Sequence, residues 1–228
     1  MKTHRTVDRI TDILDAVARS QRGMSASEVA TTLQVPMSSA HDLLTGLAAR
    51  GWLVRDGSSY RIGSAPYVLG VVAGGGDPTY GVDIDEVARR CALPAAIAVR
   101  TGATVLYTSR SSRVVDDRLS YIADAHLPRR LLATAAGRLL VALAPTQNRR
   151  AILADERRSD RDVVRAFEAA LPTIRRERIA WSDGMADPGV AAVAVAIGQA
   201  PIAAAIVVFG HRDHDRETLR AAAAILTE

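Results

Sequence analysis

The chain has 228 residues, a formal net charge of +4 and one cysteine, Cys91. This length is sufficient for two domains of ordinary size. A lone cysteine excludes intramolecular disulfides and cysteine-based zinc clusters. Because the sequence also shows no signal peptide and no apolar run of about 18 residues, we expect a cytoplasmic protein without a membrane span.

Two helices are expected near the N-terminus. Apolar residues at helical spacing predict the first, and these are Val7, Ile10, Ile13, Leu14 and Val17. Ser25-Ala26-Ser27-Glu28 has the spacing of a capping box, in which the serine hydroxyl and the glutamate carboxylate each accept a backbone N–H. The second helix should therefore begin here and end before Pro36, which cannot continue the hydrogen-bond ladder.

A third helix and a hairpin follow. The helix is predicted from Ser38 and Ser39 onward, with a buried stripe at Ala40, Leu43, Leu44 and Leu47, and Gly51 ends it. Two short strands, 52–55 and 59–62, flank Asp56-Gly57, a dipeptide that tolerates a tight hairpin turn. Three helices and a hairpin in this order predict a winged helix-turn-helix over residues 1–63, a layout that binds DNA.

Polar residues of this unit are the candidate DNA contacts. Hydroxyls and free N–H groups at a helix start can meet phosphate, and the next turn can reach base edges. The candidates are Ser25, Ser27, Ser38, Ser39, His41, Asp42, Thr45, Arg55 and Arg61. For each of them, ordinary surface exposure is the alternative. The first 62 residues hold eight Lys or Arg against six Asp or Glu, a mild excess that favours a specific dimeric binder over a nonspecific coat.

Residues 64–78 are expected to link two domains. An apolar helix over residues 64–72 has little of its own chain to pack on, so pairing with a second protomer is favoured over burial within the same chain. Gly74-Gly75-Gly76 then reads as a flexible hinge. A phosphate-binding loop is the alternative, but the GxGxxG spacing and a preceding strand are absent.

Residues 79–228 alternate between predicted helices and strands without strict order. Helices are expected at 83–91, 133–143, 147–153, 160–178 and 215–226, and strands at 95–99, 104–109, 119–123, 189–197 and 202–209, the last two joined by residues 198–201. Such an order argues for an α+β domain with a mainly antiparallel sheet.

Three motifs give the chain a resemblance to the IclR family of bacterial transcriptional regulators. Arg50-Gly51-Trp52-Leu53 with Tyr60-Arg61-Ile62-Gly63 is similar to that family's recognition-helix end and wing. Residues 132–140, LATAAGRLL, are similar to its effector-domain signature, and residues 175–180 with 189–194 resemble its pocket-closing strand and loop. The resemblance implies a GAF-like effector-binding domain. Met37 and Asp42 stand where relatives commonly carry basic residues, so DNA affinity or sequence preference should differ.

The resemblance also implies a pocket for a small organic acid. It places the acid's carboxylate at the N-terminus of the helix that begins near Thr134, and the remaining wall on the closing strands. The effector-binding candidates are Thr134, Ala135, Ala136, Gly137, Ser182, Ala192, Val207 and Phe209. Because the opposing wall is mostly apolar, we expect an aromatic or otherwise hydrophobic acid. The alternative is a pocket filled by Phe209 and its neighbours, leaving a dimerisation domain.

An enzyme is not supported by the motifs. The sequence contains no GxSxG, HExxH or P-loop pattern, and we expect no catalytic residue, metal or cofactor. His211-Arg212-Asp213-His214-Asp215 could supply metal ligands, but it reads better as the entry to a helix with Asp215 as N-cap.

The sequence thus predicts a sequence-specific DNA-binding transcriptional regulator that acts as a repressor. Its expected partners are double-stranded operator DNA, an organic acid and a second copy of the chain, as a homodimer or a homotetramer of paired dimers. The alternative is a constitutive DNA-binding dimer whose C-terminal domain is a ligand-free scaffold.

Overall fold

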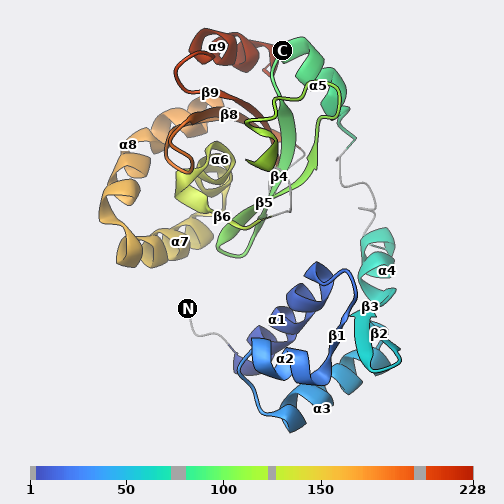
Figure 1. Ribbon diagram of the computed structural model, residues 1–228. Coiled ribbons are helices and arrows are strands. Elements are labelled where there is room, and N and C mark those ends of the chain that lie inside the picture. Colours follow the sequence, from blue (N-terminus) through green and yellow to red (C-terminus); the bar gives the residue numbers. More distant parts are fainter. Residues whose placement is uncertain (1–3, 73–80, 123–126, 198–203, 228) are drawn as a thin grey trace. The chain divides into compact units, whose positions relative to one another are not determined.

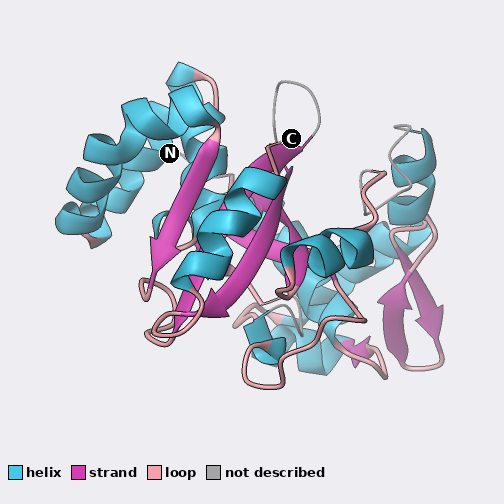
Figure 2. Cartoon of the chain, turned by 90° about the horizontal axis from the view of Figure 1, so that it is seen from above, coloured by secondary structure: helices cyan, strands magenta, loops and turns pink. Residues whose placement is uncertain are grey.

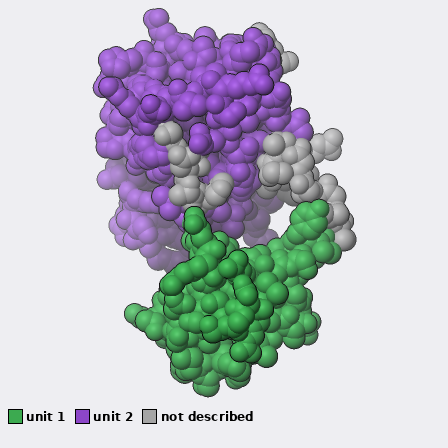
Figure 3. Space-filling view, turned by 45° about the vertical axis from the view of Figure 1, so that its right-hand side comes forward, with its two compact units in different colours: residues 1–76 green, residues 77–228 purple. Residues whose placement is uncertain are grey.

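The computed structural model describes residues 4–72, 81–122, 127–197 and 204–227. The chain divides into two compact units, Met1–Gly76 and Asp77–Glu228, which Figure 3 shows in green and purple. The boundary falls inside the segment 64–78 that the sequence assigns to a linker. The predicted glycine hinge at 74–76 and the connection at 198–201 lie outside the described residues.

The N-terminal unit contains four helices and a small sheet among its described residues (Figure 1). Its elements are α1 (Arg5–Arg19), β1 (Met24–Ser25), α2 (Ala26–Thr32), α3 (Met37–Ala49), β2 (Leu53–Asp56), β3 (Ser59–Ile62) and α4 (Ala65–Val72). The sheet has the order β1-β3-β2, and both pairings are antiparallel. The predicted winged helix-turn-helix is confirmed; the two-residue strand β1 was not predicted.

One hydrophobic core joins the three helices to the wing. Ile13 of α1, Val29 of α2, Leu44 of α3 and Leu53 of β2 are each at most 2% exposed and belong to one cluster. The helices therefore bury the apolar stripes that their sequence periodicity predicts. This packing fixes α3 with its opposite, polar face in solvent.

Local backbone geometry sets the turns of this unit. Gln34 adopts φ +52° between α2 and α3, and Gly51 adopts φ +74° after α3, so both helices end in left-handed residues. In the hairpin, Asp56 pairs with Ser59, so the turn residues are Gly57 and Ser58 rather than the predicted Asp56-Gly57. Gly57 has φ +61°, which a glycine adopts without steric strain.

The C-terminal unit is built on one antiparallel sheet. Its elements are α5 (Ile84–Cys91), β4 (Ala95–Thr101), β5 (Thr104–Arg110), the 3-10 helix η1 (Ser120–Ile122), β6 (Arg129–Arg130), the 3-10 helix η3 (Leu131–Ala133), α6 (Ala135–Leu143), α7 (Thr146–Ser159), α8 (Arg161–Glu177), β7 (Ile179–Asp183), β8 (Val190–Ile197), β9 (Ala204–His211) and α9 (Arg216–Ile225). The strand order is β6-β5-β4-β9-β8-β7, with every pairing antiparallel, which confirms the predicted α+β class.

Helices cover both faces of this sheet (Figure 2). One core lies between the sheet and helices α6 and α8, and the other lies between the opposite face and helices α5 and α9. Because strand residues alternate between faces, Ala192 and Val207 belong to the first core while Val193 and Val208 belong to the second. The candidate pocket opens into the first core.

Helix α6 is the central element of that first core. Its residues Ala135 to Ala142 are all buried, and it contacts β7, β8 and β9. Alanines on the strands beneath it, such as Ala192 and Ala205, leave room for this close approach. The helix start, where the effector carboxylate was predicted, is therefore deep inside the unit.

Several predicted elements need correction. The strand expected at 119–123 is wrong, because its described residues form a turn at Leu119 and the 3-10 helix η1. The helix expected at 147–153 extends over Thr146–Ser159. Strand β6 was not predicted as a strand because it has only two residues. Asp215 occupies the N-cap position of α9, but its carboxylate accepts the His211 backbone N–H at 2.7 Å instead of capping the helix.

Candidate nucleic-acid interface and effector pocket

The recognition helix α3 presents a polar face to solvent. Ser38, His41, Asp42 and Thr45 are exposed, whereas Ser39 is partly buried. The side chains of His41 and Asp42 lie together, with Nδ1 and Oδ1 3.9 Å apart. Four of the predicted DNA-contact residues therefore lie on the exposed surface of one helix, and one of them is the acidic Asp42.

The wing arginines are oriented by contacts within the hairpin. Arg55 Nε donates to the Gly57 carbonyl at 3.0 Å. Arg61 Nε lies 3.4 Å from Asp56 Oδ2, and its side chain is 53% exposed. Both guanidinium groups therefore lie beside the hairpin turn, where terminal nitrogens remain available to a phosphate.

The capping box at the start of α2 has formed. Glu28 N donates to Ser25 Oγ at 3.3 Å, and Ser25 N donates to Glu28 Oε2 at 2.8 Å. Ser25 Oγ also lies 3.0 Å from Ser27 Oγ. Hydrogen bonds from the backbone and side chain of Ser25 lower the pKa of the Glu28 carboxyl group. The backbone and side chain of Ser25 are thus both used in capping α2, whereas the Ser27 side chain is exposed.

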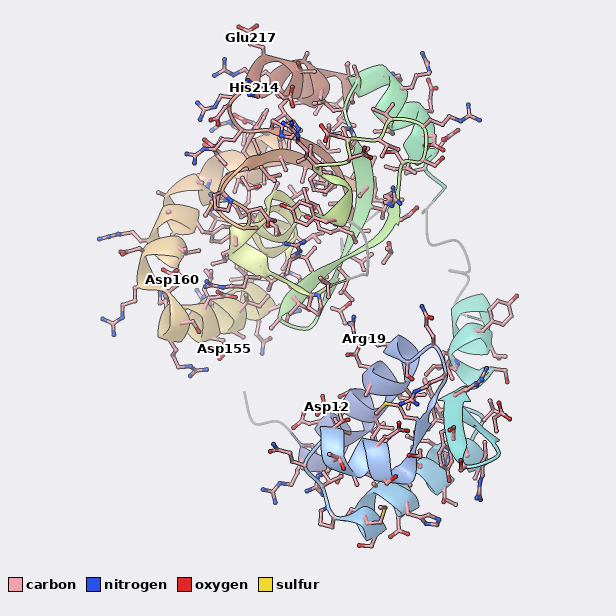
Figure 4. All side chains as sticks on the ribbon, in the orientation of Figure 1. Asp12, Arg19, Asp155, Asp160, His214 and Glu217 are labelled. Atoms are coloured by element: carbon pink, nitrogen blue, oxygen red, sulfur yellow. The ribbon has the colours of Figure 1, made fainter. Side chains whose placement is uncertain are left out.

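This cap predicts a pH-dependent contribution to stability. The pKa of Glu28 is lower in the folded than in the unfolded chain, so its contribution is present at neutral pH and is lost as pH falls through the folded pKa. Glu28→Gln should lower the thermal unfolding temperature at pH 7, and this difference should shrink in acid. The control is Asp12→Asn on α1, labelled in Figure 4, which removes an acidic group outside the capping box and should not reproduce the Glu28→Gln deficit at pH 7. A Glu28→Gln deficit that persists unchanged in acid would contradict this account.

A small pocket brings together four of the eight predicted effector residues. Thr134, Ser182, Ala192 and Phe209 line it, and its other lining residues are Tyr107, Ile122, Ala186, Asp187 and Val190. Its hollow measures about 270 Å³ out to the open mouth. Much of that volume is open to solvent, and the enclosed interior has room for only one or two water molecules.

The remaining four predicted residues lie in the core beside the pocket rather than in its lining. Ala135, Ala136, Gly137 and Val207 are buried. Thr134 Oγ1 caps α6 by accepting the Gly137 N–H at 3.0 Å. The start of α6 therefore has its cap satisfied by the chain itself, although its dipole still points toward Thr134.

An ion pair that the sequence did not reveal forms part of the pocket wall. Arg129 Nη1 lies 3.0 Å from Asp187 Oδ2, and the two side chains are 17% and 23% exposed. Tyr107 packs edge-on against Phe209, with ring centroids 5.3 Å apart. Burial raises the pKa of the Tyr107 hydroxyl, the nearby Arg129 charge opposes this rise, and the Asp187 charge adds to it.

No sequence motif identifies Arg129 and Asp187, because they lie 58 positions apart. They meet only in the folded unit, where the turn after β7 contacts β6. The only local signal is the turn-forming sequence Asp187-Pro188-Gly189.

Arg138 is a second buried cation of the same region. It is 8% exposed, its guanidinium carbon lies 5.8 Å from the centre of the Phe167 ring, and Nη1 lies 3.8 Å from Met185 Sδ. Burial lowers the pKa of its guanidinium group. The cation–π contact offsets part of the cost of this buried charge.

The other face of the sheet holds a wider groove of about 610 Å³, lined by Trp181, Asp183, Arg216 and their neighbours on β7, β8 and α9. Of the predicted effector residues it contains only Ser182. Asp183 is already paired there with Arg212 and Arg216, at 2.7 and 2.8 Å. The smaller pocket therefore remains the better candidate for an acid.

The histidine-rich segment after β9 is engaged in local contacts. His211 Nε2 lies 2.7 Å from Asp116 Oδ2. Burial acts to raise the pKa of Asp116, but hydrogen bonds from His211 and the Arg118 backbone, with their charges, lower it overall. His214, labelled in Figure 4, extends from the surface. Among the residues that the structure describes, no group of three or more His, Cys, Asp or Glu side chains could hold a metal ion.

Comparison with known protein families identifies the N-terminal unit. Residues 6–57 match the IclR helix-turn-helix domain. Residues 6–57 therefore form a helix-turn-helix domain of the IclR type. The match covers α1, α2, α3 and the start of the wing. It therefore includes α3, whose polar face is exposed, and the helices that pack against it. No curated protein matches the chain. Within the described ranges, no helix is long and apolar enough to cross a membrane.

Solved structures show that the whole chain has the fold of IclR-family transcriptional regulators. One such regulator from Brucella abortus is 18% identical, with a TM-score of 0.69, and the match covers 99% of this chain and 90% of that one. A putative IclR regulator from Silicibacter is 19% identical, with a TM-score of 0.69 and coverages of 97% and 94%. An IclR homologue from Microbacterium hydrocarbonoxydans, complexed with 4-hydroxybenzoate, is 20% identical, with a TM-score of 0.62 and coverages of 96% and 95%.

Proposed function

We propose that this chain is a one-component transcriptional repressor that binds operator DNA as a dimer and releases it when an organic acid enters the C-terminal unit. The observation that carries the DNA-binding part is the exposed polar face of α3 beside the two wing arginines, within an IclR helix-turn-helix domain. A recognition helix reads base edges in the major groove while arginines beside it neutralise backbone phosphates.

Helix α4 supports the dimeric part of the proposal. Tyr67, Val68 and Leu69 are 74%, 50% and 53% exposed, so three consecutive large apolar side chains lie in solvent. Burying such a surface against a second copy is favourable, at about 25 cal/mol per Å² of apolar area. A symmetric pair of α4 helices would also join two recognition helices into one DNA-binding dimer.

The effector part rests on the pocket of the first core. Four of the predicted effector residues line this pocket together, as residues of one binding site must: Thr134, Ser182, Ala192 and Phe209. Its walls also carry Tyr107 and Ile122, so they offer mostly apolar surface with a few polar groups, as small-molecule sites commonly do. The Microbacterium homologue holds an aromatic acid. We therefore propose an aromatic or similarly hydrophobic carboxylic acid as effector.

A second function has one observation in its favour. The pocket has room for only one or two water molecules, so a ring can enter only if the surrounding side chains move. A C-terminal unit that never opened would be a dimerisation scaffold, and the protein would bind DNA constitutively. Binding of an acid to the full chain separates the two functions.

Selection of bound fragments from a random DNA pool, followed by footprinting, tests the proposal. A dimer with two recognition helices requires a site with two-fold symmetry and half-sites about 34 Å apart or a multiple of that distance. We expect such a palindrome to be recovered and protected on both halves. A single unpaired half-site, or no enrichment of any sequence, would contradict the proposal that the chain binds DNA as a dimer.

Asp42 is predicted to limit DNA affinity. Its side chain is 84% exposed on the recognition helix, where a negative charge repels the phosphate backbone. Asp42→Arg should strengthen binding to operator and random DNA alike, by about three- to tenfold at low salt, and should steepen the salt dependence by about one unit per added phosphate contact.

The matched control for this variant is Asp12→Arg on α1, which makes the same change of charge away from the recognition helix and is labelled in Figure 4. It should raise the affinity far less. Equal gains from both variants would show that net charge alone acts, and an unchanged salt slope for Asp42→Arg would place Asp42 away from the DNA.

A further inference from the structure

The Arg129–Asp187 ion pair lies at the wall of the pocket. Asp187 lines the pocket itself, and Arg129 contacts two lining residues, since Nη1 pairs with Asp187 at 3.0 Å and Nη2 donates to the Ile122 carbonyl at 3.4 Å. Both side chains are mostly buried. A positive charge is therefore held within reach of anything that takes the place of the Asp187 carboxylate.

The guanidinium group of Arg129 is incompletely satisfied. Its Nε is buried and has no hydrogen-bond partner among the described residues. Asp187 engages Nη1, whereas an arginine fork can give a carboxylate two parallel N–H bonds. A buried donor left without an acceptor is costly, so a carboxylate that engaged Nε together with Nη2, the two donors on one edge of the guanidinium group, would gain over the present contact through Nη1 alone.

The turn that carries Asp187 is closed by backbone hydrogen bonds of its own. Gly184 N donates to the Val190 carbonyl at 2.9 Å, and Val190 N donates to the Asp187 carbonyl at 3.0 Å. These backbone bonds close the connection between β7 and β8. The Asp187 side chain can therefore leave Arg129 while the hairpin stays paired.

We propose that Arg129 is the carboxylate-binding residue of the effector pocket and that Asp187 occupies it as an internal substitute while no acid is bound. The inference rests on the proposed function, because it names the anion subsite of the same pocket. The carboxylate of the incoming acid replaces that of Asp187 on Arg129, and the aromatic ring fills the space that opens beside Tyr107 and Phe209. Displacement of Asp187 also enlarges a pocket that otherwise has room for one or two waters.

Calorimetry on the full-length chain tests this exchange with two probes, 4-hydroxybenzoate and the uncharged 4-hydroxybenzamide. Asp187→Asn removes the competing charge at nearly constant volume, so the acid should bind about tenfold more tightly. Arg129→Gln removes the charged fork, so the acid should bind about 10- to 100-fold more weakly. Neither change should move the affinity for the amide by a similar factor.

Two neighbouring residues provide matched controls. Arg130, next in the chain, is 55% exposed and lies 3.6 Å from Glu156 and 3.8 Å from Asp160. Asp183 lies in the same hairpin as Asp187 but pairs with Arg212 and Arg216. Arg130→Gln and Asp183→Asn should leave the affinity for the acid unchanged. Thermal unfolding of every variant establishes that each is folded.

The exchange is overturned if Arg129→Gln binds the acid as tightly as the parent, if Asp187→Asn brings no gain, or if acid and amide respond alike. Absence of acid binding by both the parent and Asp187→Asn also overturns it. The proposed function fails separately. If the variants shift acid affinity as expected while saturating acid leaves DNA affinity unchanged, the anion subsite stands and the regulatory function does not.

Discussion

Gly137→Ala is expected to destabilise the C-terminal unit by about 2 to 3 kcal/mol. A β-carbon at this position of α6 would lie 2.0 Å from the Leu131 carbonyl oxygen and 2.6 Å from its carbonyl carbon. These are backbone atoms, so the chain between η3 and α6 must move. Because α6 is the buried centre of the first core, the strain cannot be relieved at a surface. Denaturant unfolding of the full chain measures the loss.

Gly46→Ala is the matched control, since it makes the same substitution within a helix. A β-carbon at Gly46 of α3 would have no heavy atom within 4 Å. The alanine should therefore stabilise the N-terminal unit by about 0.5 to 1 kcal/mol, through helix propensity and a less flexible unfolded chain. Equal and small effects at Gly137 and Gly46 would show that α6 is not held against Leu131 as the structure describes.

Aromatic acids are expected to bind the C-terminal unit more tightly than two- or three-carbon acids, by about 30- to 150-fold. Burying one ring removes on the order of 100 Å² of apolar surface from water, worth about 2 to 3 kcal/mol. In this pocket the ring would meet Tyr107, Ile122 and Phe209. Calorimetry with benzoate, 4-hydroxybenzoate, acetate and pyruvate measures the difference.

Phe209→Ala supplies the variant for this prediction, because it removes one apolar wall of the pocket while leaving Arg129 in place. It should weaken the aromatic acids and change the small acids little. Preferential binding of pyruvate or acetate by the parent chain would contradict the assignment of the pocket.

Much of this fold follows from local sequence signals. The capping box at Ser25–Glu28, Pro36 and the apolar stripe of α3 each act within a few residues, so the helix-turn-helix can be predicted without knowledge of distant contacts. The antiparallel sheet of the second unit was equally predictable from its apolar strands. The strand expected at 119–123 is the exception, because Leu119 and Ile122 are buried as strand residues would be, yet their segment forms a turn and a 3-10 helix.

The candidate site was less predictable than the fold. The family resemblance indicated Thr134, Ser182, Ala192 and Phe209, which the fold brings to one pocket. The Arg129–Asp187 pair forms only when the turn after β7 meets β6, and neither residue belongs to a motif. Charged pairs of this kind are formed by tertiary structure, so a single sequence carries little trace of them.

The DNA affinity of the full chain, measured with and without saturating 4-hydroxybenzoate at one salt concentration, tests the central claim most directly. The DNA is the palindrome recovered by selection. If the acid and the operator are coupled as proposed, affinity should fall by about five- to 150-fold, the usual range of an allosteric coupling energy of 1 to 3 kcal/mol. An affinity that stays the same while calorimetry shows the acid bound would contradict the claim.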